Sequence, residues 1–345
     1  SIIDIKGNLY DNEVDYFFNE ELGLILEIDI KKIDLFYDIL DKYSKFKIHE
    51  YIKKIGVIVK TPKISIRFNN ENVYENSILN LRMKWEKTSF KIDQKQSNSY
   101  TAMAEYNGIK DRKLPIFKIS KKLIESLNNK ISNLTSLIPV VGIIREVGSN
   151  GDKEMAAAFI HAGFVVKDIT MNEICKTSGK ILENLNGIAF VGGFSFSDVS
   201  GSANGWYCQI KNNLEIYNAF ENFYNNPSKF VLGICNGCQL MIKLGWVGNG
   251  KWKLIENKSE IFESRFPSVK IKNNSIFTEN MDDCIFGIWS AHGEGRFIKT
   301  IEDDGSENDN IAIQYVDDDG IPTDRYPLNP NGSIYGTAAL TSNSG

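Results

Sequence analysis

The chain of 345 residues has few cysteines and lacks a long hydrophobic run. Five cysteines are too sparse for a disulfide framework, so we expect a reducing, cytoplasmic setting. No apolar stretch reaches the roughly 18 residues of a membrane span. The first residues show no basic head followed by an apolar segment, which argues against a signal peptide. An initiator Met is also missing, so we expect a fragment or a processed chain.

The sequence also lacks a strongly basic segment. The 40 Lys and Arg residues are outnumbered by 44 Asp and Glu residues, and no segment forms a basic arm. We therefore expect neither nucleic acid nor a membrane as a partner. Hydrophobic residues make up 42% of the chain, which is enough for a sizeable core in two ordinary domains.

Residues 1–92 mix two kinds of local pattern. Apolar, β-branched runs at 22–30 and 63–68 predict strands. Apolar residues at helical spacing over 32–45 and 75–90 predict helices. This segment is therefore expected to be an α+β piece.

The character of the sequence changes at Pro139. Before it, residues 93–137 are polar and weakly periodic, and we predict a linker that carries helices, one of them over 120–134. The near-continuous apolar run after Pro139 predicts a strand buried on both faces. Strand and helix patterns then alternate, with one helix expected over 179–185. For 138–345 we therefore predict a doubly wound, mostly parallel α/β fold of the flavodoxin type, with helices on both faces.

The sequence GICNGCQ places Cys235 between a strand-like run at 229–234 and a helical pattern. Gly233 and Gly237 flank the cysteine in a G-x-C-x-G spacing, which is typical of a nucleophile on a tight strand-to-helix turn. The helix N-terminus is expected to lower the pKa of the thiol. The backbone N–H of Asn236, next to the nucleophile, is placed to donate to an oxyanion.

Other chemistries fit the same residues. Cys235 and Cys238 have the C-x-x-C spacing of a redox dithiol, although that chemistry assigns no role to the flanking glycines. A zinc site would need two more ligands, and Cys175, Cys208 and Cys284 show no paired spacing, so we predict no metal site. A buried structural cysteine also remains open on the local pattern alone.

A second glycine pair supports the nucleophile. The strand-like run 187–193 ends in Gly192 and Gly193. At the carboxyl edge of a parallel sheet such a turn exposes N–H groups, and that of Gly193 is expected to complete an oxyanion hole opposite Cys235. A flexible loop that uses glycine only for its turns is the alternative. We predict a long Gly/Ser-rich loop after this pair.

These residues resemble the class I glutamine amidotransferases, whose cysteine lies in a G-x-C-x-G-x-Q elbow. Gln239 occupies the final position, and the resemblance implies that it helps bind glutamine. Several segments, in the right order, resemble the glutaminase domain of the phosphoribosylformylglycinamidine synthase family: 192–206, 256–266, 288–297 and 310–333.

The resemblance extends upstream. Residues 17–28 and 81–92 resemble the end of the synthetase portion in the large single-chain form of that family. It implies that 1–92 is the C-terminal part of an aminoimidazole-ribonucleotide-synthetase-like α+β domain. Residues 93–137 are then the linker, and 138–345 a class I glutamine amidotransferase domain truncated at its C-terminus.

The resemblance implies a ligase of purine biosynthesis that uses glutamine as amido donor. The enzyme would convert formylglycinamide ribonucleotide to formylglycinamidine ribonucleotide, with ATP and Mg at the upstream synthetase module and no cofactor in this segment. Cys235 would attack L-glutamine, form a γ-glutamyl thioester and release ammonia, which would pass inside the protein to the synthetase site.

The base expected by the family pattern is not found. The family has a His-x-Glu pair near the end of the domain, and this chain, whose histidines are His49, His161 and His292, ends before it. His292 and Glu294 also spell His-x-Glu, but their segment precedes the family's pair, and we expect them to shape the glutamine pocket. Residues 1–345 alone are therefore expected to have very little activity.

Two arginines and two other functions complete the sequence-based expectations. Arg265 and Arg296 could contact anions, but for each we favour an ordinary surface arginine. The alternatives to the ligase are a non-catalytic binding or regulatory homologue, and a different class I amidotransferase.

Overall fold

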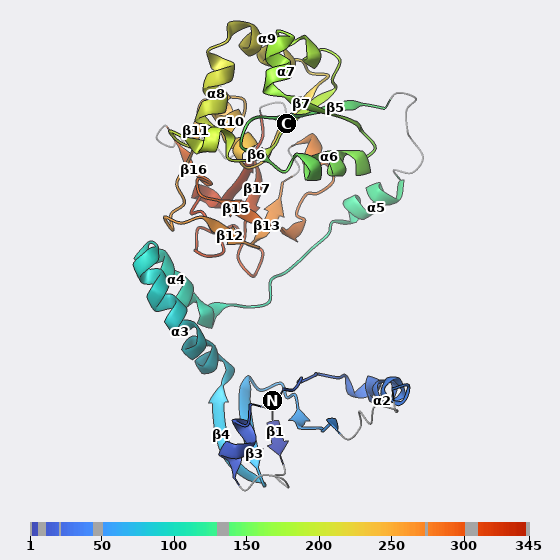
Figure 1. Cartoon of the computed structure of the whole chain (residues 1–345), viewed down its shortest axis with the longest axis vertical. Helices are drawn as coiled ribbons and strands as arrows, with labels where there is room; N and C mark the ends of the chain where they lie inside the picture. The colour runs from blue at the N-terminus through green and yellow to red at the C-terminus, as the bar shows by residue number, and fades with distance from the viewer. Residues whose placement is uncertain are drawn as a thin grey trace. The chain divides into compact units, whose positions relative to one another are not determined.

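The computed structural model describes residues 2–5, 12–20, 22–43, 51–129, 138–272, 275–300 and 310–342. The chain divides into two compact units, Ser1–Ser89 and Phe90–Gly345. Helix α3 (Ile78–Gln96) runs across the boundary between them (Figure 1). Among the helices described, none combines the length and hydrophobicity needed to cross a membrane.

The first unit contains a four-stranded sheet. Its strands, in spatial order, are β2 (Gly56–Val57), β1 (Ile2–Ile5), β3 (Lys63–Phe68) and β4 (Glu71–Ser77). β3 and β4 form a hairpin closed by Asn69 and Asn70, both at positive φ, as two-residue hairpin turns require. Strand β3 coincides with the prediction at 63–68.

This unit also contains two short helices, α1 (Glu13–Phe17) and α2 (Ile33–Asp41). The predicted helix at 32–45 is confirmed over α2, and 44–50 lies outside the described residues. The strand predicted over 22–30 is wrong. Residues 22–29 form no regular structure, and Leu22 and Leu24 are almost fully exposed. Apolar, β-branched residues indicate a strand only where a neighbouring strand pairs with them.

The second unit is built on a parallel sheet. In spatial order its strands are β10 (Phe230–Gly233), β8 (Gly187–Phe190), β5 (Val140–Arg145) and β7 (Val165–Thr170). All three pairings are parallel. The first strand in sequence lies between the second and the third, which is a flavodoxin-like order. The predicted α/β fold class is therefore confirmed.

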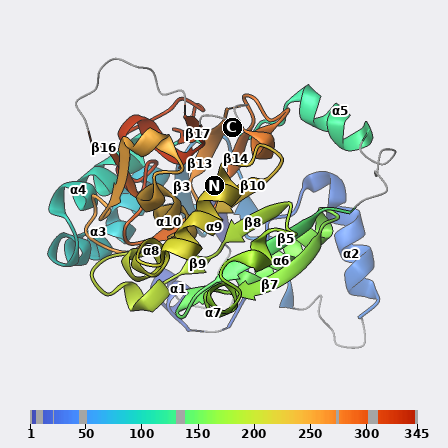
Figure 2. The same cartoon turned by 90° about the horizontal axis from the view of Figure 1, so that it is seen from above.

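Alternate residues of the strands face opposite layers of helices. On one face Ile144, Ile188 and Phe190 pack in the core cluster that also holds residues of the α8, α9 and α10 helices. On the other face Val141, Ile143 and Ala189 pack with Phe159 of α6. Strands β8, β5 and β7 lie side by side in Figure 2. The bounds of these helices and of α7 are α6 (Asp152–His161), α7 (Met171–Lys176), α8 (Asn204–Lys211), α9 (Leu214–Tyr224) and α10 (Asn236–Leu244).

Two local predictions fail in this layer. The helix expected over 179–185 is only a 3₁₀ turn, Lys180–Leu182, and the α-helix lies earlier, at α7, where Thr170 and Glu173 form a capping box. Helix α8 lies inside the predicted Gly/Ser loop. Its Trp206 and Ile210 are fully buried, and tertiary packing of this kind overrides weak local propensity.

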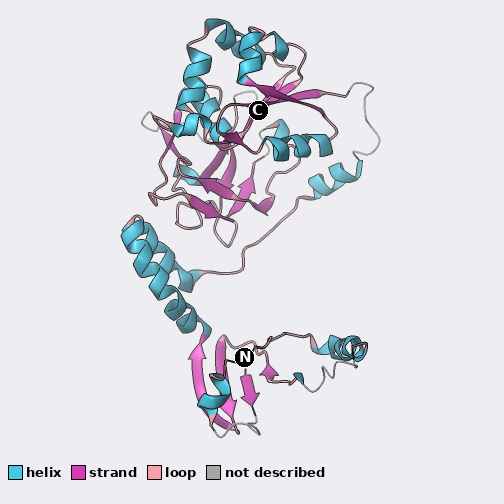
Figure 3. Cartoon of the chain, in the orientation of Figure 1, coloured by secondary structure: helices cyan, strands magenta, loops and turns pink. Residues whose placement is uncertain are grey.

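A second, antiparallel sheet follows in sequence (Figure 3). Its order is β14 (Ile285–Gly287), β13 (Ser268–Ile271), β17 (Ile311–Tyr315) and β18 (Thr337–Leu340). Three two-stranded ribbons accompany it. They pair β11 (Trp252–Ile255) with β16 (Arg296–Lys299), β12 (Glu263–Arg265) with β15 (Ser290–His292), and β6 (Ser149–Asn150) with β9 (Gly192–Gly193).

The segment before Pro139 carries helices α4 (Ser99–Gly108) and α5 (Lys121–Asn129), the second within the range predicted at 120–134. Phe90 of α3 stacks on Tyr106 of α4, with ring centroids 4.3 Å apart. Arg112 pairs with Asp318 and Lys113 pairs with Asp319, and both aspartates lie in the loop after β17. This part of the chain thus packs on the α/β domain.

Candidate active site

Cys235 stands on the turn between β10 and α10, at the N-cap of the helix. Its φ of 53° and ψ of −111° are strained for a residue with a side chain. The two flanking glycines allow the turn. A Cβ on Gly233 would lie 2.6 Å from the carbonyl oxygen of Gly237, and one on Gly237 would lie 2.3 Å from that of Phe190. The backbone therefore doubles back as an elbow requires.

Two backbone N–H groups lie beside the thiol. Those of Asn236 and Gly193 favour its thiolate form and so lower its pKa. Gly193 has a φ of +97°, and a Cβ there would lie 2.4 Å from the nitrogen of Asn150. Gly192 and Gly193 form the short strand β9, paired with β6. The glycine pair is thus a fixed element of backbone, which differs from the flexible loop considered as the alternative.

The thiol itself is partly buried. It donates a hydrogen bond to the carbonyl oxygen of Ala291, at an Sγ–O distance of 3.7 Å. Burial raises the pKa of Cys235, the N–H groups of Asn236 and Gly193 lower it in part, and the Asp198 carboxylate raises it again. The expectation that the helix N-terminus leaves the pKa of the thiol below its ordinary value is therefore wrong, because desolvation outweighs the two N–H groups.

The side chains of Asn236 and Gln239 form one buried network. Asn236 accepts from Ser195 Oγ at 2.6 Å and donates to Asp198 at 3.1 Å and to Gln239 Oε1 at 3.0 Å. Gln239 Nε2 donates to the backbone oxygen of Glu294 at 2.9 Å. Both polar atoms of the Gln239 amide thus have protein partners. Its expected contact with substrate stays a prediction.

His292 and Glu294 lie in the loop that reaches the thiol. The His292 ring contacts Ser290 Oγ at 2.8 Å through Nε2 and Asn257 Oδ1 at 3.2 Å through Nδ1, and burial lowers the pKa of the imidazole. The Glu294 carboxylate accepts from the backbone N–H of Ser202 at 3.2 and 3.3 Å. Both ring nitrogens of His292 are therefore engaged by residues other than Cys235. Its place in the glutamine pocket stays a prediction.

The remaining cysteines lack the surroundings of Cys235. Burial raises the pKa of Cys238 to about 12, and its side chain packs against the hydrophobic core of the sheet. All five cysteines are free thiols. Among the described residues no group of three His, Cys, Asp or Glu side chains could hold a metal ion.

Arg265 corrects the expectation of an ordinary surface arginine. It forms a bidentate pair with Glu105 of α4, both distances being 2.7 Å, and a further bond to Glu263 at 2.6 Å. Tyr326 bonds to both Arg265 and Glu263. Burial lowers the pKa of the guanidinium, but the bonds to Glu105 outweigh it and the net pKa is raised.

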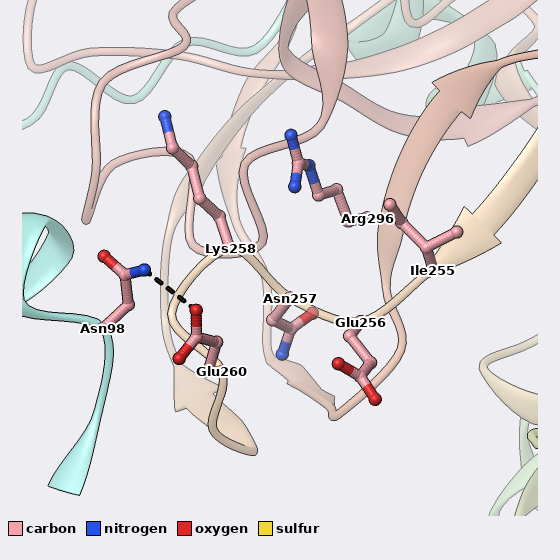
Figure 4. Close-up of a pocket in the computed structure, with 7 residues that line it drawn as sticks. All are labelled: Asn98, Ile255, Glu256, Asn257, Lys258, Glu260 and Arg296. Carbon is pink, nitrogen blue, oxygen red and sulfur yellow. Dashed lines mark hydrogen bonds between the residues drawn. The ribbon is translucent and has the colours of Figure 1, made fainter.

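Arg296 is half-buried and donates from Nε to the carbonyl oxygen of Gly332. Its side chain lines an open pocket of about 380 Å³ together with Lys258, Glu260 and Asn98 (Figure 4). Asn257 also lines this pocket, on the side of the loop that carries His292.

Sequence reasoning did not single out four polar residues of the site, Ser195, Asp198, Ser202 and Asn257. The first three lie in the Gly/Ser-rich segment, where small polar residues also indicate an ordinary loop. Asn257 lies in 256–266, one of the segments that carried the resemblance, but no local pattern distinguished it from its neighbours.

The parallel sheet, with a cysteine presented on a strand-to-helix elbow, is the class I glutaminase-like fold. Residues 138–345 match the model of the CobB/CobQ-like glutamine amidotransferase domain, and the chain belongs to that family.

Longer proteins resemble the whole chain. A probable phosphoribosylformylglycinamidine synthase, chloroplastic/mitochondrial, of Arabidopsis thaliana is 38% identical over 99% of this chain and 25% of its own length. The phosphoribosylformylglycinamidine synthase of Homo sapiens is 36% identical over 94% of this chain and 26% of its own length. The chain therefore spans about a quarter of these relatives. The solved structure of PurLQS from Thermotoga maritima, 24% identical, covers 61% of this chain and 84% of its own, with a TM-score of 0.47.

Proposed function

We propose that residues 138–345 form a glutaminase whose nucleophile is Cys235. The observation that carries the proposal is the strained elbow at Cys235, where the N–H groups of Gly193 and Asn236 lie beside the thiol. Once deprotonated, Sγ attacks the carboxamide carbon of L-glutamine and a C–S bond forms. The same two N–H groups then stabilise the oxyanion.

The tetrahedral species collapses when its C–N bond breaks. The nitrogen takes up a proton and leaves as ammonia, and a γ-glutamyl thioester remains on Cys235. Water hydrolyses the thioester to glutamate and returns the thiol. In the proposed pocket Gln239 holds the backbone of Glu294, while His292 and Glu294 fix the loop beside the thiol.

The thiol needs a base, because burial raises its pKa. His292 is a poor candidate, since Ser290 and Asn257 occupy both of its ring nitrogens. We therefore expect a group other than His292 to take the proton from the thiol.

The names of the relatives support a wider proposal for the full-length protein. It would be a cytoplasmic ligase that converts formylglycinamide ribonucleotide to formylglycinamidine ribonucleotide with ammonia from this site. ATP and Mg would act in the synthetase module, of which residues 1–92 would be the end. Residues 93–137 would link it to the glutaminase at 138–345.

Active-site labelling tests the glutaminase. The full-length protein is treated with a diazoketone analogue of glutamine, and the labelled cysteine is located by peptide mass spectrometry. We expect label on Cys235, protection by glutamine, and glutamate release in the untreated enzyme. Label on another cysteine would overturn the assignment. A wild-type protein that neither reacts nor releases glutamate would favour the non-catalytic homologue.

A further inference from the structure

Asn257 lies at the start of a turn, residues 257–261, that follows β11. It is only 2% exposed, and all polar atoms of its side chain have hydrogen-bond partners. Nδ2 donates to the carbonyl oxygens of His292 at 2.6 Å and Ile261 at 3.0 Å. Oδ1 accepts from the N–H of Gly295 at 3.1 Å. The backbone N–H of Asn257 donates to Gly293 at 2.9 Å. One buried amide therefore spans the loop from His292 to Gly295.

The loop that Asn257 holds forms the wall beside the nucleophile. Ala291, the residue just before His292, accepts a hydrogen bond from the Cys235 thiol. The backbone oxygen of Glu294 accepts one from Gln239. A shift of this loop would therefore move both groups relative to the thiol.

We propose that Asn257 is a positioning residue for the glutamine pocket, an inference that rests on the proposed glutaminase function. It does not touch the reacting atoms. It acts through the backbone of 291–295, whose position decides whether the carboxamide of glutamine reaches Cys235 at the angle that attack requires.

The same amide sets the tautomer of His292. Because Nδ2 donates to two carbonyl oxygens, Oδ1 must be the atom that faces His292 Nδ1 at 3.2 Å. An amide oxygen can only accept, so Nδ1 carries the proton and Nε2 accepts from Ser290 Oγ. Both ring nitrogens of His292 are thereby engaged, which keeps the ring from acting as a base toward the thiol.

The opposite side of the turn is tied to the linker helix. The backbone N–H of Asn98, the N-cap of α4, donates to Ser259 at 2.9 Å, and its Nδ2 donates to Glu260 at 3.0 Å (Figure 4). The turn is thus fixed between α4 and the loop at the thiol. These bonds hold the backbone around Asn257 in place, so that its side chain can position the loop.

The experiment compares Asn257→Ala with Asn329→Ala in the full-length protein. Asn329 is a matched control because it is fully buried and also makes four side-chain hydrogen bonds, with Thr323, Gly332 and Ser333 and none with 291–295. The diazoketone analogue reports on the glutamine pocket, whereas iodoacetamide reports only on the thiol.

For Asn257→Ala we expect labelling by the analogue to slow about tenfold, and the KM for glutamine to rise about tenfold, while iodoacetamide labelling changes less than about twofold. Asn329→Ala should leave all three within about twofold. Equal behaviour of the two variants would overturn the proposal, even when wild type is active. A wild-type protein without labelling at Cys235 would instead refute the glutaminase itself.

Asn257→Asp is the second test variant, to be used if Asn257→Ala does not fold. It keeps the acceptors for Gly295 and His292 but sets an oxygen against the carbonyls of His292 and Ile261. The loop should then move, and the KM for glutamine should rise with little change in iodoacetamide labelling. An unchanged KM in a folded Asp variant would contradict the positioning role.

Discussion

The α-carbon of Gly237 lies against the carbonyl oxygen of Phe190, so closely that a Cβ on the glycine would be 2.3 Å from that oxygen. The first turn of α10 therefore rests directly on the end of β8. This contact, and not only the conformation of Cys235, holds the nucleophile at the edge of the sheet.

Gly237→Ala should destabilise the protein. Alanine in a helix is ordinarily favoured over glycine by up to about 1 kcal/mol, but the clash with Phe190 reverses the sign and should cost about 1–3 kcal/mol. Urea unfolding of both proteins measures the difference. Gly245→Ala is the comparison for backbone strain without a clash, since its site has a φ of +79° and no atom within 4 Å of the added Cβ. A Gly237→Ala protein more stable than wild type would contradict the steric account.

Cys235→Ala should abolish glutamate release, because it removes the thiol that the elbow presents beside the N–H groups of Gly193 and Asn236. Cys238→Ala should retain most of the activity, since its thiol is buried in the core and has a pKa of about 12. Glutamate release by the full-length variants decides this. A Cys238→Ala protein that is folded but inactive would revive the dithiol interpretation of the C-x-x-C spacing.

His292 should remain neutral at a pH where an exposed histidine is charged. Burial lowers its pKa below 6.5, so the unfolded chain binds the proton more readily than the folded one. The contribution of His292 to the free energy of unfolding is therefore present above pH 6.5 and is lost as the pH falls toward the folded pKa. At pH values above the folded pKa, imidazole ¹⁵N shifts should report the Nδ1–H tautomer. In Asn257→Asp a carboxylate next to Nδ1–H should raise the pKa, and failure to do so would refute the assigned contact.

Arg265→Met should destabilise the packing of α4. It would leave Glu263, which is 1% exposed, without its cation, and break both bonds to Glu105, at a cost of about 2–4 kcal/mol. Lys113→Met removes a pair whose side chains are 64% and 51% exposed, and should lower the stability much less because water screens the pair. Thermal unfolding of the two variants compares them. Similar losses would mean that burial of the Arg265 cluster contributes little.

Local patterns in the sequence were sufficient for the parallel sheet and for the elbow. Buried strands and the G-x-C-x-G spacing are properties of adjacent residues, so β5, β8 and β10 and the flanking glycines of Cys235 were predicted where the structure has them. The predictions of a strand over 22–30 and of a loop in place of α8 failed, because the structure of each segment depends on what packs against it.

The sequence by itself determined that a cysteine stands at the carboxyl edge of an α/β sheet with Gly193 and Asn236 near it. Only the tertiary structure decided the direction in which the pKa of that cysteine moves, since burial by distant segments outweighs the helix N-terminus. It also decided the partners of Arg265 and Asn257. Glu105 lies 160 residues from Arg265, and His292 lies 35 from Asn257. Contacts over such separations form when the chain folds, and no local pattern encodes them.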